Sequence, residues 1–165
     1  APIKYSDSNV TRRRIERIIL QTTIVRDRQY AESQQKDKKD LTTARNIYRQ
    51  IVANITKSGF TTEEEFSEIK KESLAAIQSL DEKIYQADKE QYLRDNFRKL
   101  FTENYPAAIS ENLNNPVITY VKESAGKMIF KMQCLETGAG RPLMLIMFYA
   151  YDKASNRWAF FSEQQ

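Results

Sequence analysis

The last third of the chain most constrains the fold, because its apolar residues form four short runs separated by turn residues. The runs are rich in β-branched, aromatic and other apolar residues and occupy residues 117–123, 127–136, 141–151 and 157–161. Turn-forming segments separate them at residues 124–126, 137–140 and 152–156. Because such short connections favour hairpins between neighbouring strands, the pattern predicts a four-stranded antiparallel meander over residues 117–161.

The second run shows how the strands distribute their side chains between two faces. It alternates with the period of two of a half-buried strand, and one side carries Met128, Phe130, Met132 and Cys134. The expected hairpin pairs are Glu123 with Lys127, Glu136 with Arg141, and Tyr151 with Arg157. In this register one face is continuously apolar and needs a cover; it consists of Ile118, Tyr120, Phe130, Met132, Cys134, Leu143, Leu145, Met147 and Phe161.

The opposite face of the sheet is the first candidate binding site. In the expected register it carries an apolar cluster that consists of Ile146, Phe148, Trp158 and Phe160. If exposed, such a cluster marks a site for a protein partner or for self-association. If another helix covers it, the cluster belongs to a three-layer core. A register slip of one residue would exchange the two faces.

The chain before the sheet is expected to be helical over residues 10–113, after a flexible arm at residues 1–9. The apolar positions of the first helix recur at helical spacing and are Ile15, Ile18, Ile19, Thr22 and Val25. Asp40 is expected to cap a second helix, and Gly59 to end it in a left-handed conformation.

A third helix is expected to begin at Thr61 or Thr62, with acidic residues in its first turn. No Gly or Pro interrupts residues 60–105, so this segment is predicted to form either one helix of about 40 residues or two helices broken near residues 87–91. We therefore expect an α+β fold in which residues 10–165 form a single domain.

Two resemblances extend this prediction. The segment SGFTTEEEF at residues 58–66, followed by Lys70, Lys71 and Leu74, resembles the SHOCT motif of bacterial proteins, a short helical hairpin, over about residues 41–77. That resemblance implies an interaction or assembly module. Helices followed by an antiparallel meander also look like nuclear-transport-factor-two and cystatin-like folds, an arrangement that occurs in periplasmic assembly domains of bacterial secretion machines.

The composition argues against most catalysis. The chain contains no histidine, which removes the commonest general base, the serine and cysteine triads and the usual zinc ligand sets. Cys134 is the single cysteine and is expected to face the core, where a thiol is inert. We therefore expect no enzymatic activity, no cofactor, no metal site and no catalytic residues.

A basic segment in the first helix is the second candidate site. Residues 1–40 hold ten Lys and Arg against six Asp and Glu, whereas the rest of the chain is balanced at sixteen of each. The candidate residues for binding a polyanion are Arg12, Arg13, Arg14 and Arg17. The alternative is a solvated helix face. Nucleic acid is disfavoured because no nucleic-acid-binding motif accompanies the arginines, and an anionic membrane surface is the other polyanion considered.

Together these features predict a non-enzymatic, bacterial interaction or assembly protein, associated with the cell envelope, that binds a protein partner or itself. One alternative is a small apolar-ligand module with a pocket lined by Tyr120, Met128, Met132 and Met147. The other alternative is polyanion binding. The sequence contains no run of 18 apolar residues, so we expect no membrane-spanning helix in it. The chain begins with Ala1, so we expect a processed or longer gene product, and a periplasmic or other extracytoplasmic location over a cytoplasmic one.

Overall fold

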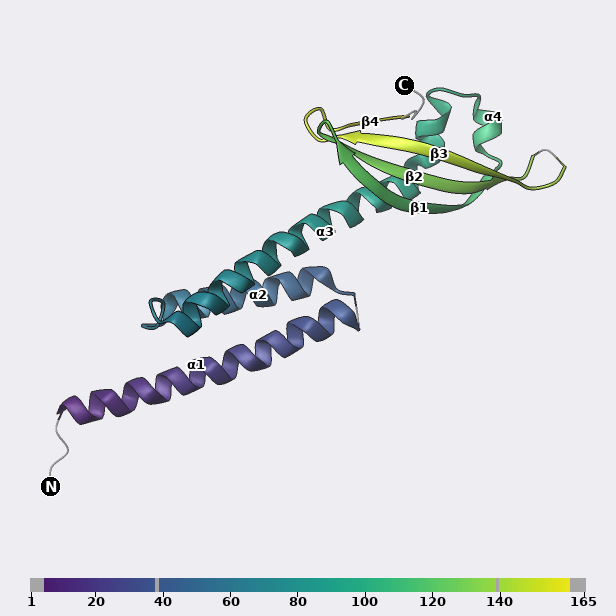
Figure 1. The fold of residues 1–165 in the computed structure, drawn as a ribbon. Coiled ribbons are helices and arrows are strands. Elements are labelled where there is room, and N and C mark those ends of the chain that lie inside the picture. Colours follow the sequence, from purple (N-terminus) through teal and green to yellow (C-terminus); the bar gives the residue numbers. More distant parts are fainter. Residues whose placement is uncertain (1–4, 38, 139, 161–165) are drawn as a thin grey trace. The chain divides into compact units, whose positions relative to one another are not determined.

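The computed structural model describes residues 5–37, 39–138 and 140–160, with residues 5–7 described by their backbone alone. The helices are α1 (Tyr5–Lys36), α2 (Leu41–Lys57), α3 (Glu64–Thr102) and α4 (Ala107–Ser110). The strands that follow are β1 (Leu113–Ser124), β2 (Lys127–Glu136), β3 (Leu143–Asp152) and β4 (Arg157–Phe160) (Figure 1). This order of helices and strands confirms the predicted α+β class.

The chain divides into two compact units, where the sequence predicted a single domain. Unit 1 comprises Ala1–Ile84 and unit 2 comprises Tyr85–Gln165. Each unit has its own hydrophobic cluster, and the two clusters share no residue. Helix α3 is continuous, which selects the one-helix alternative, and it contributes its first part to unit 1 and its last part to unit 2.

Unit 1 is built from α1, α2 and the first part of α3. Its core cluster consists of Leu20, Ile24, Ala31, Ile47, Ile51, Ile55, Phe60 and Phe66. Asp40 caps α2 as expected, because its carboxylate accepts a hydrogen bond of 3.0 Å from the backbone N–H of Thr43. Helix α3 begins at Glu64, after the expected Thr61 or Thr62, and Glu64 and Glu65 occupy its first turn.

The first helix differs from expectation at its start and in its buried face. It begins at Tyr5, so residues 5–9 of the expected arm are helical. Its buried apolar residues are Leu20, Ile24 and Ala31, which also recur at helical spacing. The predicted stripe is largely exposed, with Ile15 at 53% and Ile18 at 59%. The sequence contains two apolar stripes on one helix, and the second one faces the core.

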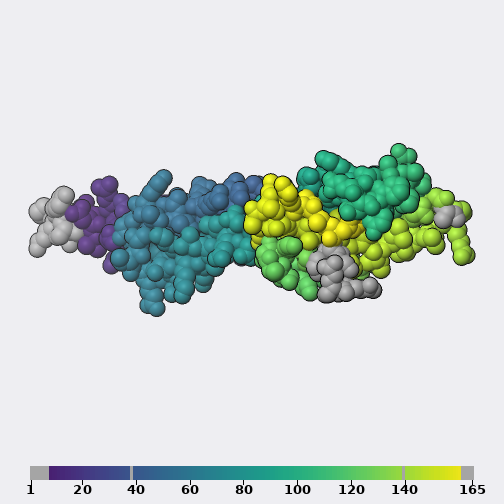
Figure 2. Space-filling model, turned by 90° about the horizontal axis from the view of Figure 1, so that it is seen from above, coloured from purple at the N-terminus to yellow at the C-terminus, as the bar shows by residue number. Residues whose placement is uncertain are grey.

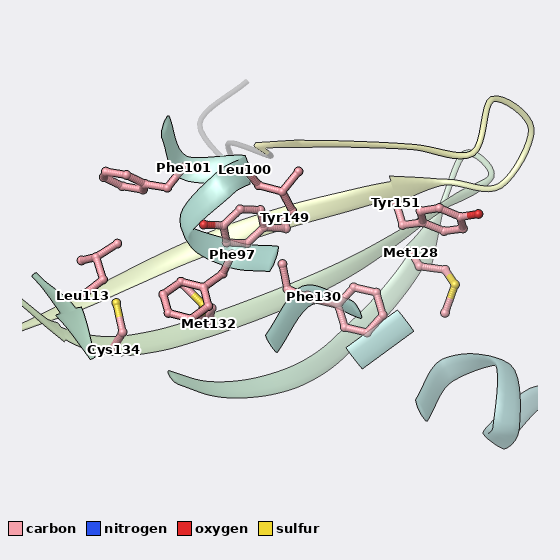
Figure 3. Packing of buried hydrophobic residues seen from close by; sticks show 11 residues of the cluster. Phe97, Leu100, Phe101, Leu113, Met128, Phe130, Met132, Cys134, Tyr149 and Tyr151 are labelled. Atoms are coloured by element: carbon pink, nitrogen blue, oxygen red, sulfur yellow. The ribbon is translucent and has the colours of Figure 1, made fainter. Parts of the chain in front are cut away.

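In unit 2 the four strands form one antiparallel sheet in the order β1-β2-β3-β4, which confirms the predicted meander. Figure 3 shows Phe97, Leu100 and Phe101 of α3 close to side chains of β2 and β3. These helix residues pack in one buried cluster with Phe130, Met132, Tyr149 and other strand residues. One face of the sheet is therefore covered by the last part of α3.

In the first three strands, the observed pairing places the side chains on the faces that the sequence predicts. Tyr120 pairs with Phe130 and Ile118 with Met132, as expected, although an irregularity next to Val121 makes Ser124 the partner of Lys127. Strand β3 is displaced by two residues, so Glu136 pairs with Leu143. Because side chains alternate with a period of two, a shift of two keeps each residue on its expected face.

The register of β4 was predicted wrongly. Asp152 pairs with Arg157 and Tyr151 with Trp158, one residue away from the expected pairing of Tyr151 with Arg157. The turn has four residues between the paired ends, and the N–H of Asn156 donates a 2.8 Å hydrogen bond to the Asp152 carbonyl. A slip of one residue exchanges the faces of a strand, so Trp158 and Phe160 lie on the covered face. Phe161, expected on that face, lies outside the described residues.

Candidate partner-binding surfaces

On the sheet face away from the core cluster, Ile129 and Ala150 are buried, but the other end of that face carries a group of exposed apolar side chains. We call it the open sheet face and define it by Val117, Met144, Ile146 and Phe148. The exposed fractions are 59% for Val117, 61% for Met144 and 53% for Ile146, and Phe148 is partly buried. The ladder brings these side chains together, because Gln133 of β2 pairs with both Val117 of β1 and Ile146 of β3.

The predicted cluster on this face is divided by the β4 register. Ile146 and Phe148 lie on the open sheet face, whereas Trp158 and Phe160 pack against the core cluster on the other side. The ring of Trp158 stacks on Tyr92 with centroids 5.7 Å apart. The ring of Phe160 lies 4.7 Å from that of Tyr149. Trp158 and Phe160 are therefore packing residues, and Met144 and Val117 take their place at the candidate site.

The four arginines predicted to bind a polyanion also divide into two groups. Arg13 donates a 2.9 Å hydrogen bond to the carbonyl of Gly59 and lies 4.5 Å above the Phe60 ring. Arg17 forms two hydrogen bonds to the Glu63 carboxylate, at 2.5 and 3.2 Å. These two arginines tie α1 to the connection between α2 and α3, which leaves Arg12 and Arg14 directed toward solvent.

The contacts of Arg13 also explain why a glycine occupies position 59. The expected left-handed conformation is absent at Gly59, since among the glycines of the described residues positive φ angles occur at Gly126 and Gly140. Instead, a Cβ atom added at Gly59 would approach the Arg13 guanidinium to 3.1 Å. Glycine therefore provides room for the arginine side chain at this turn.

The ion pair between Arg17 and Glu63 is the clearest electrostatic feature of unit 1. The hydrogen bonds from Arg17 lower the pKa of the Glu63 carboxyl below its usual value, and the same bonds raise the pKa of Arg17. Both side chains remain about one third exposed. The pair acts as a surface clamp between α1 and the start of α3.

The exposed stripe of α1 is a third candidate surface. The spacing of Ile15, Ile18, Ile19, Thr22 and Val25 predicts a core-facing stripe, but these side chains are exposed. The first turns of α1, purple in Figure 2, lie at the surface in that view. The signal that could have shown this stripe to be external is the second stripe formed by Leu20, Ile24 and Ala31.

The reactive groups of unit 2 are held in apolar surroundings. Cys134 is buried, and burial raises the pKa of its thiol. Burial likewise raises the pKa of the Tyr149 hydroxyl. Within the described ranges, no cluster of three or more Cys, Asp or Glu side chains could hold a metal ion.

The side chains predicted to line a ligand pocket belong to the core cluster. Met128 and Met132 are buried there, and Tyr120 and Met147 are partly buried and pack against it. These four side chains thus contribute to the packing between sheet and helix.

Comparison with family models, curated proteins and solved structures gives no match to this chain. The resemblances to the SHOCT motif and to nuclear-transport-factor-two and cystatin-like folds therefore stay predictions. None of the helices in the described part of the chain is both long and apolar enough to cross a membrane.

Proposed function

We propose that this chain is a non-enzymatic interaction or assembly protein that binds a protein partner through the open sheet face. The observation that supports this proposal is the exposure of Val117, Met144 and Ile146 on one face of the sheet, where Gln133 lies between Val117 and Ile146. Each side chain is more than half exposed to solvent. Burying the exposed part of such a side chain against a partner contributes roughly half of the about 1.5–3 kcal/mol for full burial, so this face favours association.

The polar residues around the open sheet face favour a protein as the partner. Gln133 pairs with Ile146, and Lys131 pairs with Phe148 and with Thr119. Gln133 lies between the apolar side chains of Val117 and Ile146, and Lys131 lies between Thr119 and Phe148. Protein interfaces likewise combine apolar side chains with hydrogen-bonding groups.

Photo-crosslinking would test this proposal. We would place a photoreactive residue at Val117, Met144 or Ile146 in the full chain and irradiate the cells that produce it. The proposal predicts one protein adduct of the same mass from all three positions. The matched controls are Ser155 and Glu111, which are also exposed but lie away from the face. Absence of adducts from the face, or the same adduct from the controls, would refute the assignment.

The other functions considered have less support from the contacts. Polyanion binding through all four arginines is not part of this proposal, because Arg13 and Arg17 are engaged within unit 1. A bacterial origin and an envelope location, expected from the resemblances, stay predictions.

A further inference from the structure

The exposed side of α1 carries a regular row of small and β-branched residues. We call this row the outer seam; its members are Thr11, Ile15, Ile18, Thr22 and Val25. The intervals alternate between four and three residues, which is the a and d spacing of a coiled coil. Ile15, Ile18 and Val25 are 53%, 59% and 55% exposed. The described structure thus leaves a coiled-coil seam open to solvent.

The outer seam is separate from the face of α1 that builds unit 1. At 100° per residue, Ile18 and Thr22 point about 120–160° away from the buried Ile24. Two shallow hollows lie along the seam. One is lined by Thr11 and Ile15 together with neighbouring residues, and the other by Thr22 and Val25 together with theirs. Hollows between seam residues are the places into which the side chains of a facing helix insert.

The chemistry of the seam favours a helix over a lipid surface. An interfacial membrane helix has a wide apolar face with Trp, Phe or Leu directed into the lipid. The outer seam is narrow, contains no aromatic residue, and includes Thr11 and Thr22. β-branched apolar residues at a and d positions are typical of coiled-coil interfaces.

The charges beside the seam indicate what kind of helix fits. Between positions 12 and 28, the six flanking e and g positions hold four arginines and no acidic residue, and they are Arg12, Arg14, Ile19, Gln21, Arg26 and Arg28. Among the described residues, Arg14 makes no hydrogen bond or ion pair. Arg12 and Arg26 pair with neighbours on α1 while their side chains stay 79% and 75% exposed. Arg28 donates a 2.8 Å hydrogen bond to Glu72 of α3, so Arg12, Arg14 and Arg26 are the arginines that a partner would meet first. Flanking charges of one sign select a partner that carries the opposite sign.

A second copy of the chain meets this requirement poorly. A homodimer through the seam would collect eight arginines along one interface without an acidic residue at any flanking position. An antiparallel homodimer would also place arginines opposite arginines. Like charges facing each other across an interface are destabilising.

We propose that the outer seam binds an amphipathic α-helix of a partner protein that has apolar a and d residues and carboxylates at its e and g positions. This site lies in unit 1 and is distinct from the open sheet face of unit 2. It therefore adds a second partner surface to the proposed function and can fail or succeed on its own.

A designed peptide of four heptads serves as the probe, with Ile at a, Leu at d and Glu at every e and g position. The control peptide carries Lys at those e and g positions. We expect the full chain to bind the acidic peptide at least about tenfold more tightly than the basic peptide in fluorescence anisotropy at low salt, because only carboxylates complement the arginines. The double substitution Arg14→Glu and Arg26→Glu leaves two arginines against two glutamates at the flanking positions and should abolish that preference.

Matched variants separate the seam from the rest of the molecule. Ile18→Asp should weaken binding of the acidic peptide by at least about tenfold. Tyr30→Ser changes a side chain of similar exposure, 54%, on another side of α1 and should leave binding within about twofold. The change Met144→Lys with Ile146→Lys on the open sheet face should also leave it unchanged. Circular dichroism would verify that α1 remains helical in each variant.

Three results would overturn the proposal. The first is equal binding of both peptides, or binding of neither. The second is a dimer in sedimentation equilibrium that Ile18→Asp dissociates, which would assign the seam to a second copy. The third is co-sedimentation with vesicles of phosphatidylcholine and phosphatidylserine at a ratio of about 2:1, lost in Ile18→Asp, which would assign it to a lipid surface.

Discussion

At the scale of single residues, the turn between β1 and β2 contains a strained alanine. Ala125 and Gly126 connect the paired ends Ser124 and Lys127, and both have positive φ angles, 52° and 77°. Two successive residues of this kind make the type I′ turn, whose twist matches that of the strands. Glycine accepts such a conformation without cost, but alanine does not.

We predict that Ala125→Asn stabilises the chain by about 0.5–1 kcal/mol, because Asn-Gly is the preferred sequence for this turn. The measurement is the free energy of unfolding from urea denaturation. Ala154→Asn, in the exposed turn before β4, is the matched control and should change it by less than about 0.5 kcal/mol. A lower stability for Ala125→Asn would show that Ala125 is not strained.

The clamp between Arg17 and Glu63 predicts a dependence of stability on pH. The folded state lowers the pKa of Glu63, so the carboxylate stabilises the fold fully above its unfolded pKa of about 4.3. That contribution is lost as the pH falls through the lower, folded pKa. Glu63→Gln should therefore reduce stability near neutral pH, and the difference should shrink as the pH falls and the carboxyl becomes protonated.

Urea denaturation at several pH values would measure this effect. Glu103→Gln is the control, because Glu103 is exposed and has no ion pair within the described residues. If the difference between Glu63→Gln and the unaltered chain stayed constant with pH, the clamp would not contribute through its charge.

At the scale of secondary-structure elements, the sequence predicted the strands well and their last pairing poorly. Strand β2 has the predicted bounds, residues 127–136, because its alternation is regular and turn residues flank it. The face of β4 depends on whether its turn has four or five residues. Neither composition nor periodicity distinguishes these lengths, so Trp158 and Phe160 were placed on the wrong face.

The first helix shows a related limit. Both Ile15 with Ile18 and Leu20 with Ile24 fit a helical period, and the period alone cannot say which pair faces the core. The choice depends on tertiary contacts, such as those of Arg13 and Arg17 with the connection before α3. Two of the four arginines predicted to bind a polyanion, Arg13 and Arg17, therefore make contacts within unit 1. The period of the stripe of Ile15 and Ile18 also does not show that this stripe is exposed.

The pairing of β4 predicts contrasting effects for two substitutions. Trp158→Ala should destabilise the chain by about 2–3 kcal/mol, because the ring contacts Tyr92, Phe130 and Tyr151. Ile146→Ala, at an exposed position, should cost less than about 0.5 kcal/mol. Thermal or urea unfolding would compare the two. Equal effects, or a larger effect for Ile146→Ala, would restore the register in which both residues share a face.

At the scale of the whole molecule, two compact units each combine a buried core with a solvent-exposed apolar row. Unit 1 exposes the outer seam of α1, and unit 2 exposes the open sheet face. Single exposed apolar residues are common on proteins, whereas ordered rows of them usually mark interaction sites. An account based on recognition therefore explains these rows without requiring reactive groups.

The most direct measurement uses a photoreactive residue at Val117 in the full chain, with and without the change Met144→Lys and Ile146→Lys. Adduct yield and urea stability would be measured on both proteins. The account predicts that the lysines lower the yield at least about tenfold while unfolding free energy changes by less than about 1 kcal/mol, because these side chains are exposed. An unchanged yield, or loss of folding in the lysine variant, would contradict it.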